Sequence, residues 1–327
     1  MMFKKLQHSS KNTLKTLVLG LCIGALSSCQ ASDTPSNQAK VDENTRNITP
    51  ISSVFDAFSC IPKESAFVAA HRGTVENSEY PENALISLKA LHAKGVPFAE
   101  IDISRLKDGT YILFHDGVWD QKSTGKGPVA ATNWEDSQKI LLKDTRGQIS
   151  ASRPTKFKDV LSWAKGKMYL EIDFKSSADP AQVIDLIRKA DMLDQVILIS
   201  YTAEQAEALH KLAPTAMLSV GINKAGDVKA LNIRGIPAQN MSAWTGRGQS
   251  SQRVRDVLAQ NNIPVLAGSF FDLDPVIHKT GRTDLYKPFA EFPDLVVTDY
   301  AFDAQQALEI KGESLTKMQK CLSSHRQ

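Results

Sequence analysis

Apolar segments of strand length alternate with helix-like segments eight times along this sequence, and this alternation constrains the fold more than any other feature. Eight runs are expected to be strands: 66–70, 98–103, 168–174, 196–201, 216–222, 236–241, 263–267 and 295–298. Eight β-α repeats are the number that closes a (β/α)₈ TIM barrel. A doubly wound open sheet shares the alternation, but no Gly-rich phosphate loop follows the first strand. We therefore predict an α/β fold of the TIM-barrel type.

One region interrupts the alternation. A ninth apolar run at residues 111–115 follows the second strand, and a polar, glycine-punctuated stretch continues to Arg153 before the helical pattern at 156–164. Because barrel loops of this kind lie at the carboxyl ends of the strands, we predict a small insertion at about residues 105–155 on that face.

The first 28 residues have the pattern of an export signal. Four lysines precede an apolar run at residues 17–26, which is shorter than the roughly 20 residues needed to span a bilayer. The stretch Leu26-Ser27-Ser28-Cys29 resembles the site at which lipoprotein signal peptides are cut. Residues 1–28 are therefore predicted to be a lipoprotein signal peptide and Cys29 the lipidation site; an ordinary secretory signal is the alternative.

Residues 29–50 contain few large apolar side chains, so we predict a flexible tether there and a folded domain at residues 51–327. This arrangement predicts an exported protein, anchored to the membrane by lipid in a bacterial cell envelope and facing the periplasm. Removing residues 1–28 takes four lysines from the 39 basic residues and leaves 35 against 36 acidic ones. Such a balance gives no basic face for nucleic acid, and none is expected as a partner.

The cysteine count predicts a disulfide. Of four cysteines, Cys22 lies in the signal peptide and Cys29 is the predicted lipidation site, which leaves Cys60 and Cys321 near the two ends of the domain. Exported proteins meet an oxidising compartment, and the ends of a domain usually lie close together. We therefore predict a bond between Cys60 and Cys321.

Ionisable residues stand at the ends of four apolar runs, where barrel enzymes place their active sites. The four groups are His71-Arg72-Gly73, Glu100-Ile101-Asp102, His115-Asp116 and Glu171-Ile172-Asp173. Side chains at i and i+2 of a strand share a face, so both acidic pairs are expected to point into one mouth. Converging carboxylates need a counter-charge, and oxygen ligands favour a hard cation, Ca²⁺ or Mg²⁺. For either pair alone, a salt bridge or a solvated strand end is the alternative.

The two histidines in these groups are candidates for acid-base catalysis. Imidazole titrates near neutral pH, so His71 and His115 can accept and donate protons on opposite sides of a reacting phosphorus. Arg72, beside His71, is a planar donor that suits phosphate oxygens, although an ordinary ion pair is an equal alternative.

Taken in order, these motifs resemble the glycerophosphodiester phosphodiesterase family, and the resemblance extends over about residues 66–308. It rests on His71-Arg72-Gly73, Pro81-Glu82-Asn83, Glu100 with Asp102, His115-Asp116 and the later Glu171, and Ser200-Tyr201 and Thr298-Asp299 also fit. It implies an enzyme that hydrolyses small glycerophosphodiesters, such as glycerophosphocholine, to sn-glycerol 3-phosphate and an alcohol. It also implies Glu100, Asp102 and Glu171 as ligands of one divalent cation, His71 and His115 as the acid-base pair, and Arg72 as a phosphate ligand.

The sequence departs from the family pattern at three places, the first of which is Ala84, where a threonine usually follows Pro81-Glu82-Asn83. Asp173 stands where a lysine that faces the phosphate is typical, and Leu266-Ala267-Gly268-Ser269 replaces the Trp-Thr motif of the seventh strand. Either Lys175, two residues on and in the same strand phase, supplies the missing charge to the phosphate, or Asp173 is an additional metal ligand.

Other readings of the same residues stay open. Attack by the neighbouring glycerol hydroxyl, through a cyclic phosphate, and direct attack by water fit them equally. A lysophospholipase D or sphingomyelinase D type activity on a lipid phosphodiester, or a non-catalytic barrel lipoprotein, are the alternative functions. A lipid substrate favours an exposed apolar rim, whereas residues 117–153 are mostly polar, with Trp119 and Trp134 as their only aromatic residues.

Overall fold

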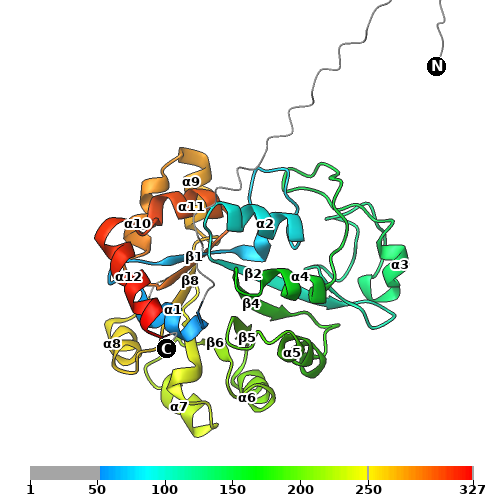
Figure 1. Cartoon of the computed structure of the whole chain (residues 1–327). Helices are drawn as coiled ribbons and strands as arrows, with labels where there is room; N and C mark the ends of the chain where they lie inside the picture. Colours follow the sequence, from blue (N-terminus) through cyan, green and yellow to red (C-terminus); the bar gives the residue numbers. More distant parts are fainter. Residues whose placement is uncertain (1–51, 249, 326–327) are drawn as a thin grey trace, which may run out of the picture. The chain divides into compact units, whose positions relative to one another are not determined.

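Parallel strands close into a barrel with connecting helices on its outside (Figure 1). A computed structural model describes residues 52–248 and 250–325. Its strands are β1 (Phe67–Ala70), β2 (Phe98–Arg105), β3 (Tyr111–Leu113), β4 (Tyr169–Phe174), β5 (Val196–Ile199), β6 (Met217–Gly221), β7 (Met241–Trp244), β8 (Val265–Gly268) and β9 (Leu295–Thr298). The pairing order is β1-β9-β8-β7-β6-β5-β4-β2-β3, and an additional β1–β2 pairing closes the ring. The predicted TIM barrel is confirmed.

Helices cover the barrel and lead from each strand to the next, except between the antiparallel strands β2 and β3. Those between strands are α2 (Leu85–Ala93), α4 (Phe157–Ala164), α5 (Pro180–Lys189), α6 (Ala203–Leu212), α7 (Asp227–Ile233), α8 (Gln252–Gln260), α9 (Leu273–Thr280) and α10 (Tyr286–Phe289). Outside this alternation lie α1 (Val54–Cys60), α3 (Trp134–Ser137), α11 (Ala301–Leu308) and α12 (Gly312–Ser324). Short 3₁₀ turns are η1 (His71–Gly73), η2 (Val129–Ala131), η3 (Ala238–Asn240) and η4 (Thr283–Leu285).

One predicted strand is misplaced. The run at residues 236–241 contains Pro237, which has no amide hydrogen to donate to a neighbouring strand. In the structure Pro237 precedes the 3₁₀ turn η3, and the strand β7 begins only at Met241. The shift places Trp244 at the carboxyl end of β7, in the region of the barrel mouth.

The interior of the barrel is filled in layers by alternate residues of the strands. Phe98, Tyr169 and Leu295 begin their strands and pack together as a lower layer, which the helix α1 covers through Val54 and Ala57. Each strand turns its other residues outward against the helices. On β2 and β4 the inward positions above this layer are acidic rather than apolar.

The chain leaves the barrel pattern between β2 and α4. The strand β3 runs antiparallel to β2, with Ile103 opposite Leu113, and the polar stretch that follows folds against it. This insertion has a small core of its own, in which Phe114, Trp119 and Leu142 are buried. The indole Nε1 of Trp119 also donates to Thr132 Oγ1 at 2.9 Å. His115, at the end of β3, is therefore held by a packed unit rather than by a loose loop.

Cys60, the last residue of α1, and Cys321, on α12, form the disulfide expected from the sequence. Their Cα atoms lie 5.6 Å apart although 261 positions separate them along the chain. Figure 1 shows α1 and α12 side by side at one end of the barrel. The two helices that carry the bond therefore close the same end of the domain.

Replacing both Cys60 and Cys321 with serine is expected to lower the free energy of unfolding by about 3 kcal/mol, because the unfolded chain is no longer constrained by so long a loop. Urea unfolding of the oxidised protein and of the double variant measures the difference. The same shift should appear when the unaltered protein is reduced, and equal midpoints with and without the bond would contradict the prediction.

The predicted signal peptide, the lipidation site Cys29 and the tether at 29–50 lie outside the described residues. Within the described part of the chain, each helix is too short or too polar to cross a bilayer.

Candidate active site

Acidic side chains from two neighbouring strands meet above the apolar lower layer. The register of β2 and β4 places Glu100 beside Glu171 and, one layer higher, Asp102 beside Asp173. All four carboxylates are buried, with no more than 6% of any residue exposed. One oxygen each of Glu100, Asp102 and Asp173 lies within 4.8 Å of the others. Glu171 lies one layer deeper than Asp173 and is outside this group of three.

These carboxylates lie in a cavity of ≈ 410 Å³. Its lining includes the predicted proton carriers His71 and His115, all four carboxylates and Lys175. It does not include Arg72. The topology thus brings together residues from β1, β2, β3 and β4 at the mouth of the barrel, as the sequence interpretation requires.

The charge state of the carboxylates reflects their burial. Burial raises the pKa of Glu171 to about 8. Burial, together with the nearby charges of Asp102 and Asp173, raises the pKa of Glu100 well above its usual value. In addition, Glu171 Oε1 and Asp173 Oδ1 are buried without a hydrogen-bond partner. Buried oxygen atoms that lack donors are what a hard divalent cation requires, so the residues present fit a Ca²⁺ or Mg²⁺ ion.

Lys175 forms ion pairs with two of these carboxylates. Its Nζ atom lies 2.6 Å from Asp102 Oδ1 and 2.7 Å from Asp173 Oδ2. Burial lowers the pKa of Lys175, but the two carboxylates outweigh burial and the net shift is upward. In this arrangement the ammonium group neutralises part of the acidic cluster. Its predicted contact with a substrate phosphate requires it to turn away from them.

Each histidine is held at Nδ1 by a carboxylate. His71 Nδ1 lies 2.8 Å from Asp299 Oδ1, and His115 Nδ1 lies 2.8 Å from Asp116 Oδ1. An ionised carboxylate only accepts hydrogen bonds, so Nδ1 is the donor in both pairs and Nε2 is left for the substrate. The side chains of His71 and His115 keep 20% and 31% of their surface exposed. Both imidazoles are therefore oriented and accessible, as proton transfer requires.

Arg72 is tied to the protein rather than to the cavity. Its backbone has a left-handed conformation with φ 55°, and its backbone N–H donates to Glu100 Oε2 at 2.7 Å. The guanidinium NH1 lies 3.6 Å from Glu82 Oε1, which corresponds to the ion-pair alternative. The backbone of Arg72 thus orients a carboxylate of the acidic cluster, while a contact of its guanidinium with phosphate stays a prediction.

Several residues of the site carry no sequence signal that assigned them a role. Asn83 accepts from the Asp102 backbone N–H at 2.9 Å and donates to Asp102 Oδ2 at 2.6 Å. Tyr201 donates to Asp173 Oδ2 at 2.8 Å, and Trp244 and Phe270 form an aromatic wall of the cavity. Asn83 and Tyr201 belong to stretches that resemble the family, whereas Trp244 and Phe270 do not. Tyr201, Trp244 at the end of β7, and Phe270 come from segments far apart along the chain.

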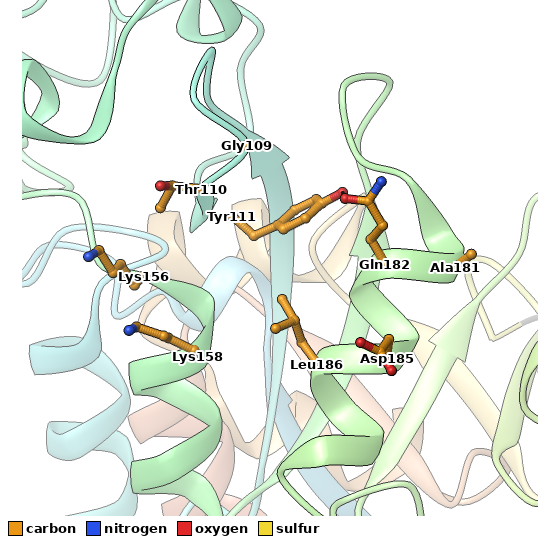
Figure 2. A pocket seen from close by; sticks show the side chains of 9 residues that line it. All are labelled: Gly109, Thr110, Tyr111, Lys156, Lys158, Ala181, Gln182, Asp185 and Leu186. Carbon is orange, nitrogen blue, oxygen red and sulfur yellow. The ribbon is translucent and has the colours of Figure 1, made fainter.

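A second hollow, of ≈ 600 Å³, lies on the flank of the barrel between β3, α4 and α5 (Figure 2). Figure 2 shows the Tyr111 hydroxyl directed at Gln182, to which it donates at 3.2 Å, and the side chains of Lys156 and Lys158 along the opposite side. None of the residues predicted to be catalytic or metal-binding lines it. The cavity at the barrel mouth is therefore the candidate active site.

Comparisons with known proteins point to one family. The model of the glycerophosphoryl diester phosphodiesterase family matches residues 71–267, which is more than half of the chain. A curated glycerophosphodiester phosphodiesterase of Caldanaerobacter subterraneus is 27% identical over 155 residues, which are 45% of this chain and 63% of that protein. The chain thus matches less than two thirds of the length of the first curated relatives.

Solved structures with the same fold carry related names. A glycerophosphoryl diester phosphodiesterase of Parabacteroides distasonis superposes with a TM-score of 0.72 at 23% identity, covering 81% of this chain and 96% of that one. A phosphodiesterase of Oleispira antarctica, in complex with the product sn-glycerol-3-phosphate, gives 0.57 at 20% identity, covering 78% and 99%. At these identities the similarity shows a shared fold.

Proposed function

This chain belongs to the glycerophosphoryl diester phosphodiesterase family, and we propose that it hydrolyses glycerophosphodiesters to sn-glycerol 3-phosphate and an alcohol. The observation that carries the proposal is the meeting of two carboxylate-held histidines with four buried carboxylates around one cavity. This arrangement offers a cation site and two proton carriers that can act on the same bound substrate. The product bound in the Oleispira antarctica relative supports the same substrate class.

The acidic cluster would hold one divalent cation. Glu100 and Asp102, with Glu171 or Asp173 from the neighbouring strand, supply the oxygen ligands. When bound, Ca²⁺ or Mg²⁺ would neutralise the phosphate and orient the glycerol hydroxyls. The residues that fix the cluster are Asn83, which orients Asp102, and the Arg72 backbone N–H, which orients Glu100.

The two histidines would carry the protons of the reaction. One imidazole accepts the proton of the attacking oxygen at Nε2, and the other donates a proton to the oxygen of the leaving alcohol. The phosphorus-oxygen bond to the alcohol breaks as the bond to the attacking oxygen forms. The attacking oxygen belongs either to water or to the neighbouring glycerol hydroxyl; in the second case the same histidines, with roles exchanged, serve the opening of the cyclic phosphate by water.

One observation favours the alternative of a lipid diester. Tyr201 and Phe271 line the cavity and are exposed at 71% and 43%, so they add apolar surface at its mouth. The two tryptophans of the insertion add little, because Trp119 is fully buried and Trp134 lies under the Lys156 ammonium. An anchored protein in the cell envelope, as proposed from residues 1–50, would encounter both kinds of diester.

The purified protein is expected to release glycerol 3-phosphate from glycerophosphocholine only when a divalent cation is present. The measurement compares activity after EDTA treatment with activity after Ca²⁺ or Mg²⁺ is added back, alongside lysophosphatidylcholine as a lipid substrate. Release from the small diester alone supports the proposal. Choline release from the lysolipid alone supports the alternative of a lipid phosphodiester as substrate. If neither diester is cleaved with any cation, the non-catalytic alternative is favoured.

A further inference from the structure

His71 contacts two parts of the protein for which the sequence predicts no role. The first is the segment from Gly268, at the end of β8, to Asp274, at the start of α9, which overlaps the departure from the family pattern at residues 266–269. The second is Asp299, directly after β9, which is 228 positions away along the chain and binds His71 Nδ1. A hydrogen bond from the Asp299 backbone N–H to Asp274 joins the two parts.

The face of the imidazole is covered by Phe270. The two rings are stacked, with centroids 4.1 Å apart and an angle of 5° between their planes. This position of Phe270 depends on Gly268, because a Cβ atom at Gly268 would lie 2.6 Å from Phe270 Cε1. Any larger residue at position 268 therefore displaces the ring that lies on His71. The close contact with Phe270 thus explains why position 268 is a glycine.

The edge of the imidazole is held through a buried carboxylate in the same segment. Asp274 Oδ2 accepts from the Asp299 backbone N–H and from Thr298 Oγ1, both at 2.8 Å. Asp274 Oδ1 accepts from the Tyr286 hydroxyl at 2.9 Å. Asp274 is 1% exposed, and Tyr286 and Thr298 are fully buried. The backbone of Asp299 is therefore fixed by a network without solvent, and its side chain reaches His71 from a rigid base.

This network lies behind the cavity rather than in it. Val297 and Phe270 line the cavity, but Asp299 and Asp274 do not. Asp299 consequently acts on a substrate only through His71, and Asp274 only through Asp299. A group of this kind changes the rate of proton transfer more than the affinity for the substrate.

We propose that the segment 268–274 orients the imidazole of His71. Phe270 fixes the plane of the ring. Asp274 fixes Asp299, which keeps the proton on Nδ1 and leaves Nε2 for the reaction. Gly268 makes room for Phe270. Asp299 and Asp274 are positioning residues. The inference deepens the proposed function and relies on it for the role of Nε2, but the orientation of the imidazole can be measured without any turnover.

The first experiment measures the tautomer of His71 by ¹⁵N NMR of the histidine rings, at a pH at which the imidazole is neutral and with His71→Gln to assign the signal. The proton is expected on Nδ1 in the unaltered protein. Asp299→Asn and Asp274→Asn are expected to reduce the Nδ1–H population, whereas the exposed control Asp256→Asn on α8 leaves it unchanged. An unchanged tautomer in both network variants overturns the proposal. If Asp274→Asn fails to fold, Tyr286→Phe removes one donor to Asp274 and is expected to act in the same direction.

The second experiment uses Gly268→Ala and Phe270→Leu, alone and together, with Phe292→Leu as the matched aromatic control. Because Gly268 acts only through the Phe270 ring, Gly268→Ala is expected to lower kcat roughly tenfold or more in the unaltered protein and to have no further effect in the Phe270→Leu protein. Additive effects of the two changes overturn the role of Gly268. Asp299→Asn is expected to lower kcat by about 10²- to 10⁴-fold with KM little changed; a fall in affinity alone overturns its role.

The two experiments separate this inference from the proposed function. If the protein has no phosphodiesterase activity but its His71 tautomer still depends on Asp299 and Asp274, the proposed function is refuted and the orienting role of segment 268–274 is supported. If the enzyme is active but its His71 tautomer is unchanged in both variants, only the orienting role of segment 268–274 is refuted.

Discussion

Replacing His115 with glutamine is expected to lower kcat for glycerophosphocholine by about 10²- to 10⁴-fold, which is the usual contribution of one acid-base group. Its Nδ1 is bound by Asp116 and its Nε2 is left for the substrate, so the loss removes a proton carrier and little binding surface. KM is therefore expected to change far less than kcat. Steady-state kinetics with saturating cation measures both.

The His115→Gln change is expected to leave the fold intact. The core of the insertion is formed by Phe114, Trp119 and their neighbours, none of which depends on the imidazole of His115. The thermal unfolding midpoint is thus expected to stay the same. His92→Gln on α2, outside the barrel, serves as the matched control and should retain full activity. A His115→Gln protein that keeps its kcat would show that proton transfer does not pass through this residue.

Removing the charge of Glu171 is expected to stabilise the cation-free protein at alkaline pH. Its pKa of about 8 in the folded state compares with an ordinary value of 4.5, and the cause is burial. Between these values the folded protein keeps a proton that the unfolded chain has released. Stability is therefore fully present below about pH 4.5 and falls as the pH rises to about 8, by a total on the order of 4 to 5 kcal/mol.

Glu171→Gln removes this loss, because the glutamine side chain does not titrate. Urea unfolding in the presence of EDTA, at pH 5 and at pH 8.5, is expected to show a shallower pH dependence for the variant than for the unaltered protein. Glu100 also has a raised pKa, so part of the dependence remains in both proteins. Equal slopes in the two proteins would contradict the burial argument.

The same variant tests the role of Glu171 toward the cation. If Glu171 is a ligand, Ca²⁺ or Mg²⁺ stabilises the unaltered protein at pH 8.5 and stabilises Glu171→Gln less. Asp173→Asn is the matched comparison, because Asp173 belongs to the group of three carboxylates whose oxygens lie within 4.8 Å. Whichever replacement weakens cation binding more identifies the β4 ligand.

The positions of many site residues could be predicted from short-range patterns in the sequence. The spacing of Glu100 and Asp102 places both on one face of a strand, and their position at a strand end places them at the mouth of a barrel. His71 and His115 follow β1 and β3 in the same manner. These inferences need only the two-residue period of a strand and the closure of eight repeats.

The remaining parts depend on contacts that no local pattern encodes. Asp299 meets His71 across 228 positions, and Asp274 becomes important only because β8 and β9 are neighbours in the barrel. The ion pairs of Lys175 with Asp102 and Asp173 depend on the register of two strands and on side-chain rotamers. The late start of β7 depends on whether Pro237 lies in a strand or a turn, which neighbouring segments decide.

The bond between α1 and α12 makes residues 60–321 a covalent ring, and the first six residues of α1 precede it. The helix α1 covers the lower layer of the barrel interior through Val54 and Ala57. In a linear chain, end helices are usually the first to fray and to admit a protease. Here the carboxyl end of α1 and the last turn of α12 stay joined, so α12 cannot fray away from the barrel without moving the end of α1 with it.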